Sequence, residues 1–150
     1  MALNPNFIGR TYPSSEPYLV GREKIREFAS ATCDFNPAYH DIAAAQGLGY
    51  RDLVAPPTFA FTVVFASSRL VVMDPDLGLD YTKVVHGEES FVYSRPVVAG
   101  DELVVTNTIE NIRAAAGNDM ITVKSSVSTT SGELVVVTTM VIVARGTDSQ

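Results

Sequence analysis

The sequence predicts an α+β fold in which an antiparallel sheet wraps around one long, buried helix. Residues 57–73 are apolar on nearly every side, and this run is too long for a single core strand. Everything after Lys83 has the pattern of strands separated by turns. One buried helix is therefore followed by a sheet that covers it.

The segment before the long helix predicts an irregular arm and an amphipathic helix. Prolines and glycines over residues 5–21 indicate the arm, with one short strand at residues 18–20. Residues 22–32 then predict a helix, because one face collects the apolar or small residues Ile25, Phe28, Ala29 and Thr32. The pair Asn36-Pro37 breaks this pattern, since the residue before a proline avoids the helical conformation.

Two more helices are expected ahead of the sheet. A short one is predicted from about residue 38 to residue 46, ended by Gly47 and Gly49. The long central helix is predicted over Pro57–Met73, because proline is favoured in the first helical turn.

The second half of the chain predicts an antiparallel meander. Phe91 and Tyr93 alternate with polar neighbours, and the later strands are predicted at 103–113, 120–130 and 134–144. Three connections have the composition of hairpin turns: Ala99-Gly100-Asp101, Gly117-Asn118-Asp119 and Ser131-Gly132-Glu133.

Composition excludes several classes of function. The chain has 150 residues, 46% of them hydrophobic, and a net charge of −6, which argues against nucleic acid as a partner. One cysteine and two histidines are too few for a typical metal site, so we expect no metal and no other cofactor. No signal peptide and no membrane-spanning run are evident, so we expect a cytoplasmic protein that does not bind membranes.

The predicted elements carry more apolar surface than one sheet and one helix can cover. Residues 135–137 and 141–143 are apolar on both strand faces, and the long helix is apolar nearly all round. A second subunit is the simplest cover for this surface, and a deep monomer core is the alternative.

One segment of the chain has the residues for proton transfer. Asp34 and His40 flank the turn Asn36-Pro37, where a carboxylate can orient an imidazole that titrates near neutrality. The alternative is structural, because Asp34 can cap backbone amides in such a turn. His86 enters a predicted strand and is interpreted as a packed or hydrogen-bonded residue. Cys33 precedes an acidic residue, which disfavours a thiolate nucleophile.

Three stretches together resemble the MaoC-like (R)-specific enoyl hydratases and (3R)-hydroxyacyl dehydratases, which have the hotdog fold. They are Arg22–Phe28, Leu53–Phe59 and Arg95–Asp101. More narrowly, the chain resembles the actinobacterial dehydratase A-type subunits. The resemblance implies one MaoC-like hotdog domain over residues 1–150 and pairing as a homodimer or as a heterodimer with a catalytic subunit. It also implies a thioester of coenzyme A or of acyl carrier protein as substrate, with the acyl chain in a tunnel beside the central helix.

The resemblance assigns the catalytic roles to Asp34 and His40, with Asn36 and Pro37 supporting their loop. In active members of the family the motif reads D-x-N-P-x-H, but here His40 follows Asp34 by six positions instead of five. One extra residue turns a helical side chain by about 100°, so His40 reaches the pocket only if the loop absorbs the insertion.

A second departure concerns the start of the central helix. Active members have a His-Gly pair there, whose backbone N–H groups hold the thioester oxygen. This chain has Pro56-Pro57, and proline has no N–H to donate. The remaining candidate donors at the helix N-terminus are the N–H groups of Thr58 and Phe59.

Three hypotheses for function remain. The first is a dehydratase or hydratase subunit in fatty-acid metabolism that shapes the acyl tunnel beside a catalytic partner. The second is a self-sufficient homo-oligomeric enzyme that uses Asp34 and His40, and the third is a non-enzymatic protein that binds acyl thioesters. The residues expected to line or back the acyl pocket are Phe59, Phe61, Val63, Val64 and Phe65.

Overall fold

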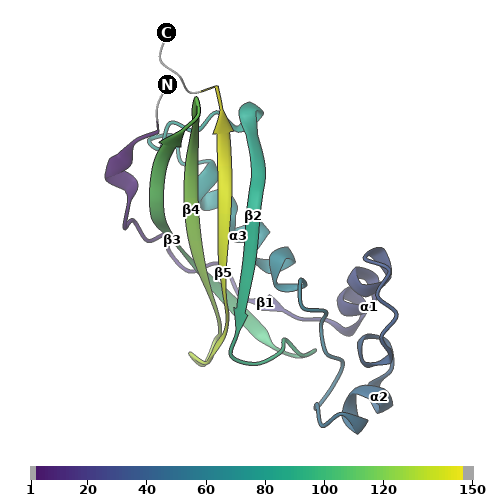
Figure 1. Cartoon of the computed structure of the whole chain (residues 1–150). Helices are drawn as coiled ribbons and strands as arrows, with labels where there is room; N and C mark the ends of the chain where they lie inside the picture. Colours follow the sequence, from purple (N-terminus) through teal and green to yellow (C-terminus); the bar gives the residue numbers. More distant parts are fainter. Residues whose placement is uncertain (1–2, 147–150) are drawn as a thin grey trace.

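A computed structural model describes residues 3–146. The core of the molecule is a curled five-stranded antiparallel sheet in the order β1-β3-β4-β5-β2, with the helix α3 lying against its inner face (Figure 1). The shorter helices α1 and α2 form a helical lobe beside the end of the sheet where β2 finishes (Figure 1). The fold is the hotdog fold expected from the sequence.

The elements follow the predicted order. The strands are β1 (Tyr18–Leu19), β2 (Val84–Tyr93), β3 (Glu102–Ala115), β4 (Asn118–Thr129) and β5 (Leu134–Arg145). The α-helices are α1 (Arg22–Ala31), α2 (Ile42–Gly47) and α3 (Ala60–Val72), and the 3-10 turns are η1 (Pro5–Phe7), η2 (Pro37–Tyr39) and η3 (Tyr81–Lys83).

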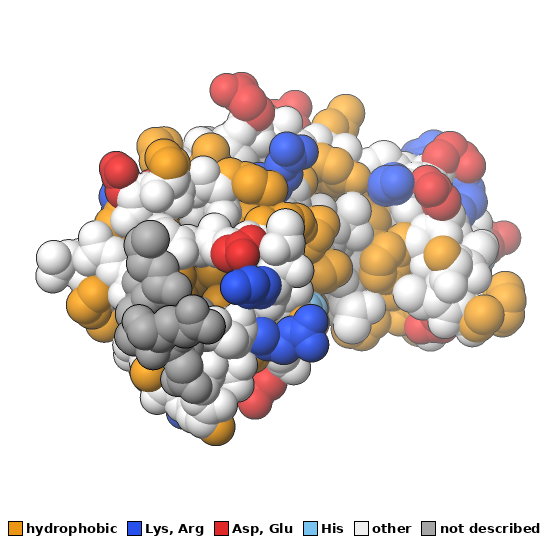
Figure 2. All heavy atoms as spheres, turned by 90° about the horizontal axis from the view of Figure 1, so that it is seen from above, with side chains coloured by type: hydrophobic (Ala, Val, Ile, Leu, Met, Phe, Trp, Pro, Cys, Tyr) orange, Lys and Arg blue, Asp and Glu red, His pale blue; other side chains and the backbone are white. Residues whose placement is uncertain are grey.

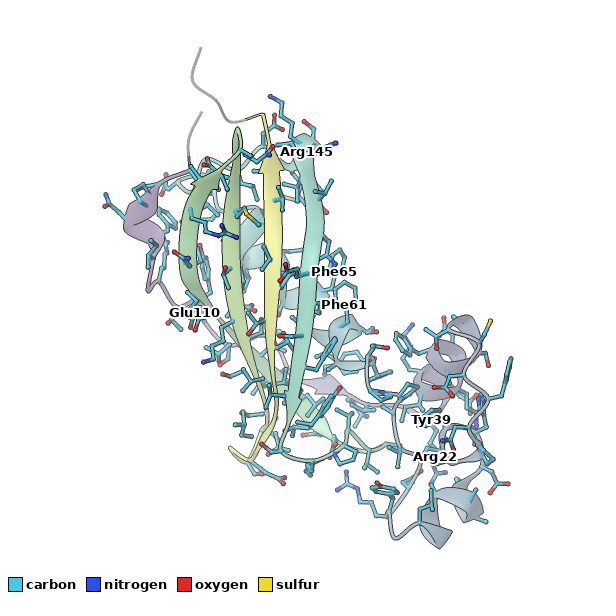
Figure 3. All side chains as sticks on the ribbon, viewed as in Figure 1. Arg22, Tyr39, Phe61, Phe65, Glu110 and Arg145 are labelled. Carbon is cyan, nitrogen blue, oxygen red and sulfur yellow. The ribbon has the colours of Figure 1, made fainter. Side chains whose placement is uncertain are left out.

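Helix α3 is buried on the side that faces the sheet. Val64 and Val71 are fully buried against the inner residues of β3, β4 and β5. Below the helix, Asn107 donates a hydrogen bond to Ser67 (3.1 Å) and accepts one from Ser125 (2.7 Å), so that these buried polar groups satisfy one another. Phe61 and Phe65 point away from this core, toward the side of β2 (Figure 3).

Two helix predictions need correction. The helix expected over residues 38–46 is split into η2 and α2, because Asp41 accepts a hydrogen bond from the N–H of Ala44 and so begins a separate helix. The central helix begins at Ala60 instead of Pro57. The residues before it form a turn of their own, in which the N–H of Phe59 donates to the carbonyl of Pro56.

The prediction of a hairpin at Ala99-Gly100-Asp101 was wrong. Strand β2 pairs with β5 on the far side of the sheet, while β3 pairs with β1 and β4, so only β3, β4 and β5 form a meander. Gly100, at φ 89°, donates a hydrogen bond to Val20 and brings the connection alongside β1. The composition of this segment correctly predicts a turn, but composition does not determine which strands a turn connects.

Strand β2 forms the open edge of the sheet, because it pairs only with β5 among the described residues. Large apolar side chains are exposed on this strand and on the neighbouring part of α3, and the exposed fractions are 70% for Val92, 50% for Phe65 and 51% for Met73. Seen from the upper end of the sheet, apolar side chains also reach the surface between the sheet and the helical lobe (Figure 2).

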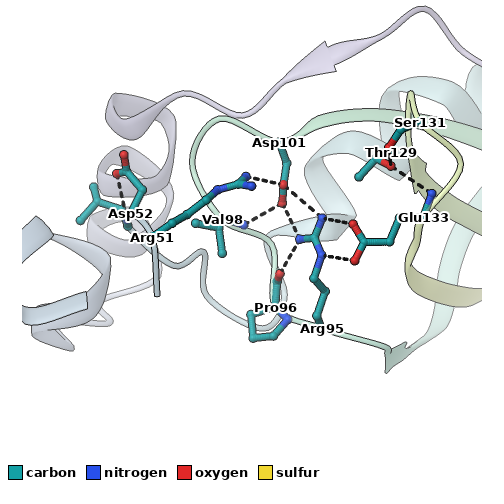
Figure 4. Close-up of polar contacts among 10 residues, drawn as sticks. Arg51, Asp52, Arg95, Pro96, Val98, Asp101, Thr129, Ser131 and Glu133 are labelled. Atoms are coloured by element: carbon teal, nitrogen blue, oxygen red, sulfur yellow. Dashed lines mark hydrogen bonds and ion pairs between the residues drawn. The ribbon is translucent and has the colours of Figure 1, made fainter. Parts of the chain in front are cut away.

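The buried carboxylate of Asp101 connects the helical lobe to the sheet (Figure 4). Arg95, at the end of β2, donates to both of its oxygens (2.8 and 3.1 Å), and Arg51, before α3, donates to one of them (2.6 Å). The N–H of Val98 donates to the same carboxylate, and Arg95 forms a second, bidentate pair with Glu133 in the turn before β5. The Arg95–Asp101 motif is therefore a structural clamp.

These contacts set the protonation of Asp101. Burial alone would raise the pKa of its carboxyl, but the hydrogen bonds from Arg95 and Val98 outweigh burial and hold the pKa below its ordinary value. A carboxyl whose pKa is lowered in the folded state stabilises the fold above its unfolded-state pKa, and this contribution is lost as the pH falls through the folded-state pKa.

We predict that Asp101→Asn lowers the free energy of unfolding at pH 7 by on the order of 3 kcal/mol, because two arginines lose their buried carboxylate. Urea unfolding at a series of pH values measures this loss. The difference between the variant and the wild type should begin to shrink as the pH falls below about 4, the ordinary pKa of an aspartate in the unfolded chain, and should be lost only below the lowered pKa of the folded state. Asp76→Asn, at an exposed carboxylate, is the matched control.

Candidate active-site loop and acyl cavity

The loop from Asp34 to His40 is held by hydrogen bonds between neighbouring residues. The N–H of Asn36 donates to Oδ1 of Asp34 (3.2 Å), and the N–H of Ala38 donates to Oδ1 of Asn36 (3.1 Å). Pro37 fits the first position of η2 because its missing N–H would have no partner there. Asp34 and Asn36 thus cap backbone amides in the turn, as expected if these residues have a structural role.

The imidazole of His40 lies back against its own loop and lines none of the cavities described here. The turn η2 brings the imidazole back over the loop, where Nε2 lies 3.0 Å from the main-chain carbonyl oxygen of Asp34. A carbonyl oxygen can only accept a hydrogen bond, so Nε2 carries the proton and the lone pair of the neutral ring is on Nδ1. The ring of Phe35 stacks on the imidazole at 6.3 Å, and Arg26 donates to the carbonyl of His40.

A small cavity of about 280 Å³ connects this loop to the start of α3, and three tyrosines line it: Tyr39, Tyr50 and Tyr93. Burial, together with the nearby Asp34 carboxylate, raises the pKa of Tyr39. The hydroxyl of Tyr93 donates to the carbonyl of Pro57 (2.6 Å), and burial raises its pKa to about 12. Tyr39 and Tyr93 are thus neutral hydrogen-bonding groups at neutral pH.

The start of α3 offers few free donors. Pro56 and Pro57 have none, and the N–H of Phe59 is used in the turn to the carbonyl of Pro56 (2.9 Å). Of the two N–H groups expected from the sequence, only that of Thr58 is without a hydrogen bond among the described residues, and Thr58 is exposed.

The structure separates the residues expected to line the acyl pocket. The rings of Phe61 and Phe65 contact each other at a tilt, with centroids 5.3 Å apart (Figure 3). Phe65 lines a largely apolar cavity of about 520 Å³ between α3 and the sheet strands β2 and β5. Phe59 is instead fully buried in the core, as is Val64, and Val63 borders a different groove beneath the N-terminal arm.

Sequence reasoning missed a second pair of titratable side chains. His86 lies in β2 and its Nε2 contacts the carbonyl of Glu88 (3.0 Å), as expected for a hydrogen-bonded strand residue. Its ring also lines the large cavity, and its Nε2 lies 3.2 Å from the buried carboxylate of Glu89. The run His86-Gly87-Glu88-Glu89 contains both residues. The sequence predicts His86 and Glu89 on the same face of the strand only if a β-bulge is assumed at Gly87.

Among residues 3–146, no group of three or more His, Cys, Asp or Glu side chains is arranged to hold a metal ion. No helix in that part of the chain has the length and apolar character needed to cross a membrane.

Comparison with known proteins identifies the class of protein. A family profile for the FAS1-like dehydratase domain region matches residues 6–138. A UPF0336 protein of Streptomyces avermitilis is 54% identical over 99% of both chains. The chain therefore belongs to the FAS1-like dehydratase region family and has relatives among the UPF0336 proteins of actinobacteria.

Solved structures support the same assignment. A MaoC-like dehydratase is 40% identical, with a TM-score of 0.86 over 93% of this chain, which spans 42% of that structure. The HadBC (3R)-hydroxyacyl-ACP dehydratase complex of Mycobacterium tuberculosis is 31% identical, with a TM-score of 0.79 over 91% of this chain and 96% of that one. The chain is thus a hotdog protein of the hydratase and dehydratase type.

We predict that Asn36→Ala lowers the free energy of unfolding by about 1 kcal/mol, because the N–H of Ala38 loses its side-chain acceptor. Without this cap the imidazole of His40 should also lose its fixed tautomer, which ¹⁵N NMR of the ring nitrogens can follow. Asn36→Asp keeps an acceptor oxygen and should keep both properties. Equal effects of the two variants would show that the side-chain oxygen does not hold the loop.

Proposed function

We propose that this protein is a subunit of a (3R)-hydroxyacyl-thioester dehydratase or (R)-enoyl hydratase in fatty-acid metabolism, and that it shapes the acyl cavity beside a catalytic partner chain. The observation that carries the proposal is the start of α3. Reaction at a thioester needs backbone donors that stabilise the negative charge on its oxygen, and here Pro56 and Pro57 have no N–H while that of Phe59 is used in an internal turn. The cavity lined by Phe65 remains, so this chain retains a place for the acyl group but offers few donors for the chemistry.

The open edge of the sheet supports a partner chain. Strand β2 has unpaired backbone groups along its outer side and exposed apolar residues beside them, and such an edge is a template for pairing with another strand. The cavity lies between this edge strand and α3, so a second hotdog chain that continues the sheet at β2 would also close the cavity. The similar HadBC structure is described as a complex, which agrees with a paired arrangement.

The second candidate function is a self-sufficient hydratase that uses Asp34 and His40. It is favoured by the turn η2, which returns the imidazole to the loop of Asp34 in spite of the additional residue. In this case Nδ1 of His40 would accept or return a proton of the acyl thioester, and the N–H of Thr58 would stabilise the thioester oxygen. A binding protein without activity is the third possibility. All three candidates are consistent with a cytoplasmic location and with either coenzyme A or acyl carrier protein as the thiol.

The hydration of crotonyl-CoA tests these candidates. The reaction is measured as the loss of enone absorbance. We expect the purified chain alone to be at least about a hundredfold slower than the same chain with its catalytic partner. The reason is that the start of α3 offers few backbone N–H donors to the thioester oxygen. His40→Ala should leave the activity of the pair unchanged. Ser30→Ala, on an exposed position of α1, is the matched control.

The alternative outcomes are distinct. Rapid turnover by the chain alone that disappears in His40→Ala would replace the proposal by the self-sufficient enzyme. A folded chain that binds acyl-CoA but is inactive alone and with every candidate partner would be a binding protein.

The acyl cavity gives a separate prediction. Met73 lines the cavity near the end of α3 and is half exposed, so Met73→Trp should fill space without disturbing the core. In the active assembly the kcat/KM for a ten-carbon enoyl-CoA should fall about tenfold, while that for crotonyl-CoA should change little. Leu134→Trp, an exposed position away from the cavity, should affect neither substrate. Equal losses for both substrates would argue against this cavity as the acyl site.

A further inference from the structure

A β-bulge places two titratable side chains on the inner face of β2. The register with β5 shifts between His86 and Glu88, so that His86 lies opposite Ile142 and Glu89 opposite Met140. In a regular strand, residues three apart point to opposite faces, but one additional residue brings His86 and Glu89 to the same face. Gly87 occupies the bulge, and a Cβ there would lie 3.2 Å from the carbonyl oxygen of Val141.

Glu89 is buried without full hydrogen bonding. Its side chain is 10% exposed, and neither carboxylate oxygen has a hydrogen bond of good geometry. The hydroxyl of Thr138 on β5 is buried beside this carboxylate. Burial raises the pKa of the Glu89 carboxyl, against the lowering effects of Thr138 and His86. The neighbouring groups that can hold this carboxylate are thus Thr138 and His86, and of these only His86 lines the cavity.

His86 connects this carboxylate to the cavity. Its Nε2 faces two acceptors, the carbonyl of Glu88 and the carboxylate of Glu89, and therefore carries a proton. Phe61 stacks on the ring at 5.4 Å and fixes its plane. Nδ1 has no hydrogen-bond partner among the described residues, and the ring lines the cavity whose other walls are mostly apolar. In the neutral ring, Nδ1 is an acceptor that faces a cavity whose other polar lining residues are Ser68, Arg69 and Tyr81.

We propose that His86 binds a hydroxyl group carried by the acyl chain beyond its reacting carbons, with Glu89 as the positioning residue behind the imidazole. This inference rests on the proposed function, because it takes the cavity between α3 and β2 as the site of the acyl chain. The hydroxyl donates to Nδ1 of His86, and a plain alkyl chain leaves that acceptor unpaired. A site built to hydrogen-bond a hydroxyl discriminates strongly against the analogue that lacks it. The protein therefore prefers hydroxylated acyl chains to alkyl chains of the same length.

Binding of three saturated thioesters tests the inference separately from any chemistry: decanoyl-CoA, 6-hydroxydecanoyl-CoA and 10-hydroxydecanoyl-CoA. Calorimetry on the purified chain, in the oligomeric state that it adopts in solution, should give a Kd about tenfold lower for at least one hydroxylated ligand, the effect of one added hydrogen bond. His86→Phe keeps the aromatic stack and should remove the preference. Glu89→Gln keeps an acceptor for Nε2 and should retain most of it, whereas Glu89→Leu should lose it.

The controls separate this inference from the proposed function. Ser90→Ala, an exposed neighbour on β2, should leave the preference unchanged, and circular dichroism should show that each variant is folded. Decanoyl-CoA that binds as tightly as both hydroxylated ligands would overturn the inference and leave the proposed function standing. A preference that survives in His86→Phe would overturn it as well. Failure of all three thioesters to bind, both to the chain alone and to its assembly with the catalytic partner, would overturn both.

Discussion

Three segments that are distant in the sequence are joined through the carboxylate of Asp101, and a carboxylate buried to this extent is stable only while its cationic partners remain in place. Arg95 comes from the end of β2 and Arg51 from the segment before α3, while Glu133 holds Arg95 from the turn before β5. The position of the helical lobe relative to the sheet depends on this clamp. The start of α3 and the loop of His40 are positioned through the same connection, because Ala55 and Ala99 exchange main-chain hydrogen bonds with Val97 and Leu53 beside it.

Much of the fold could be predicted from periodicity, because the core consists of one apolar helix and strands that alternate in the ordinary way. The limits of α1 and of the last three strands were predicted to within about two residues. Strand order was not predictable in the same way. The turn at Gly100 has the residues of a hairpin, yet it leads from the edge strand β2 to β3 on the far side of the sheet, and only contacts between distant residues decide that.

The candidate site was predictable in part for similar reasons. The residues of the loop from Asp34 to His40 are neighbours in the sequence, so their proximity could be anticipated. That η2 would bring the imidazole of His40 back against this loop depends on a backbone conformation that no single residue specifies. Glu89 was missed because a strand with regular alternation would have placed it on the opposite face from His86. Phe59 was assigned to the acyl pocket, whereas its packing against Phe28 places it in the core.

The strand order also determines when the chain can complete its structure during synthesis. Strand β2 and helix α3 are made early, but the strand that pairs with β2 is β5, the last to be made. The apolar inner side of α3 and one full edge of β2 therefore stay uncovered until residues 134–145 have left the ribosome, whereas β3 and β4 can pair as soon as their hairpin emerges. A nascent chain of this protein exposes these aggregation-prone surfaces while β3, β4 and β5 are being made, and this interval is when a chaperone or a partner chain would contact it.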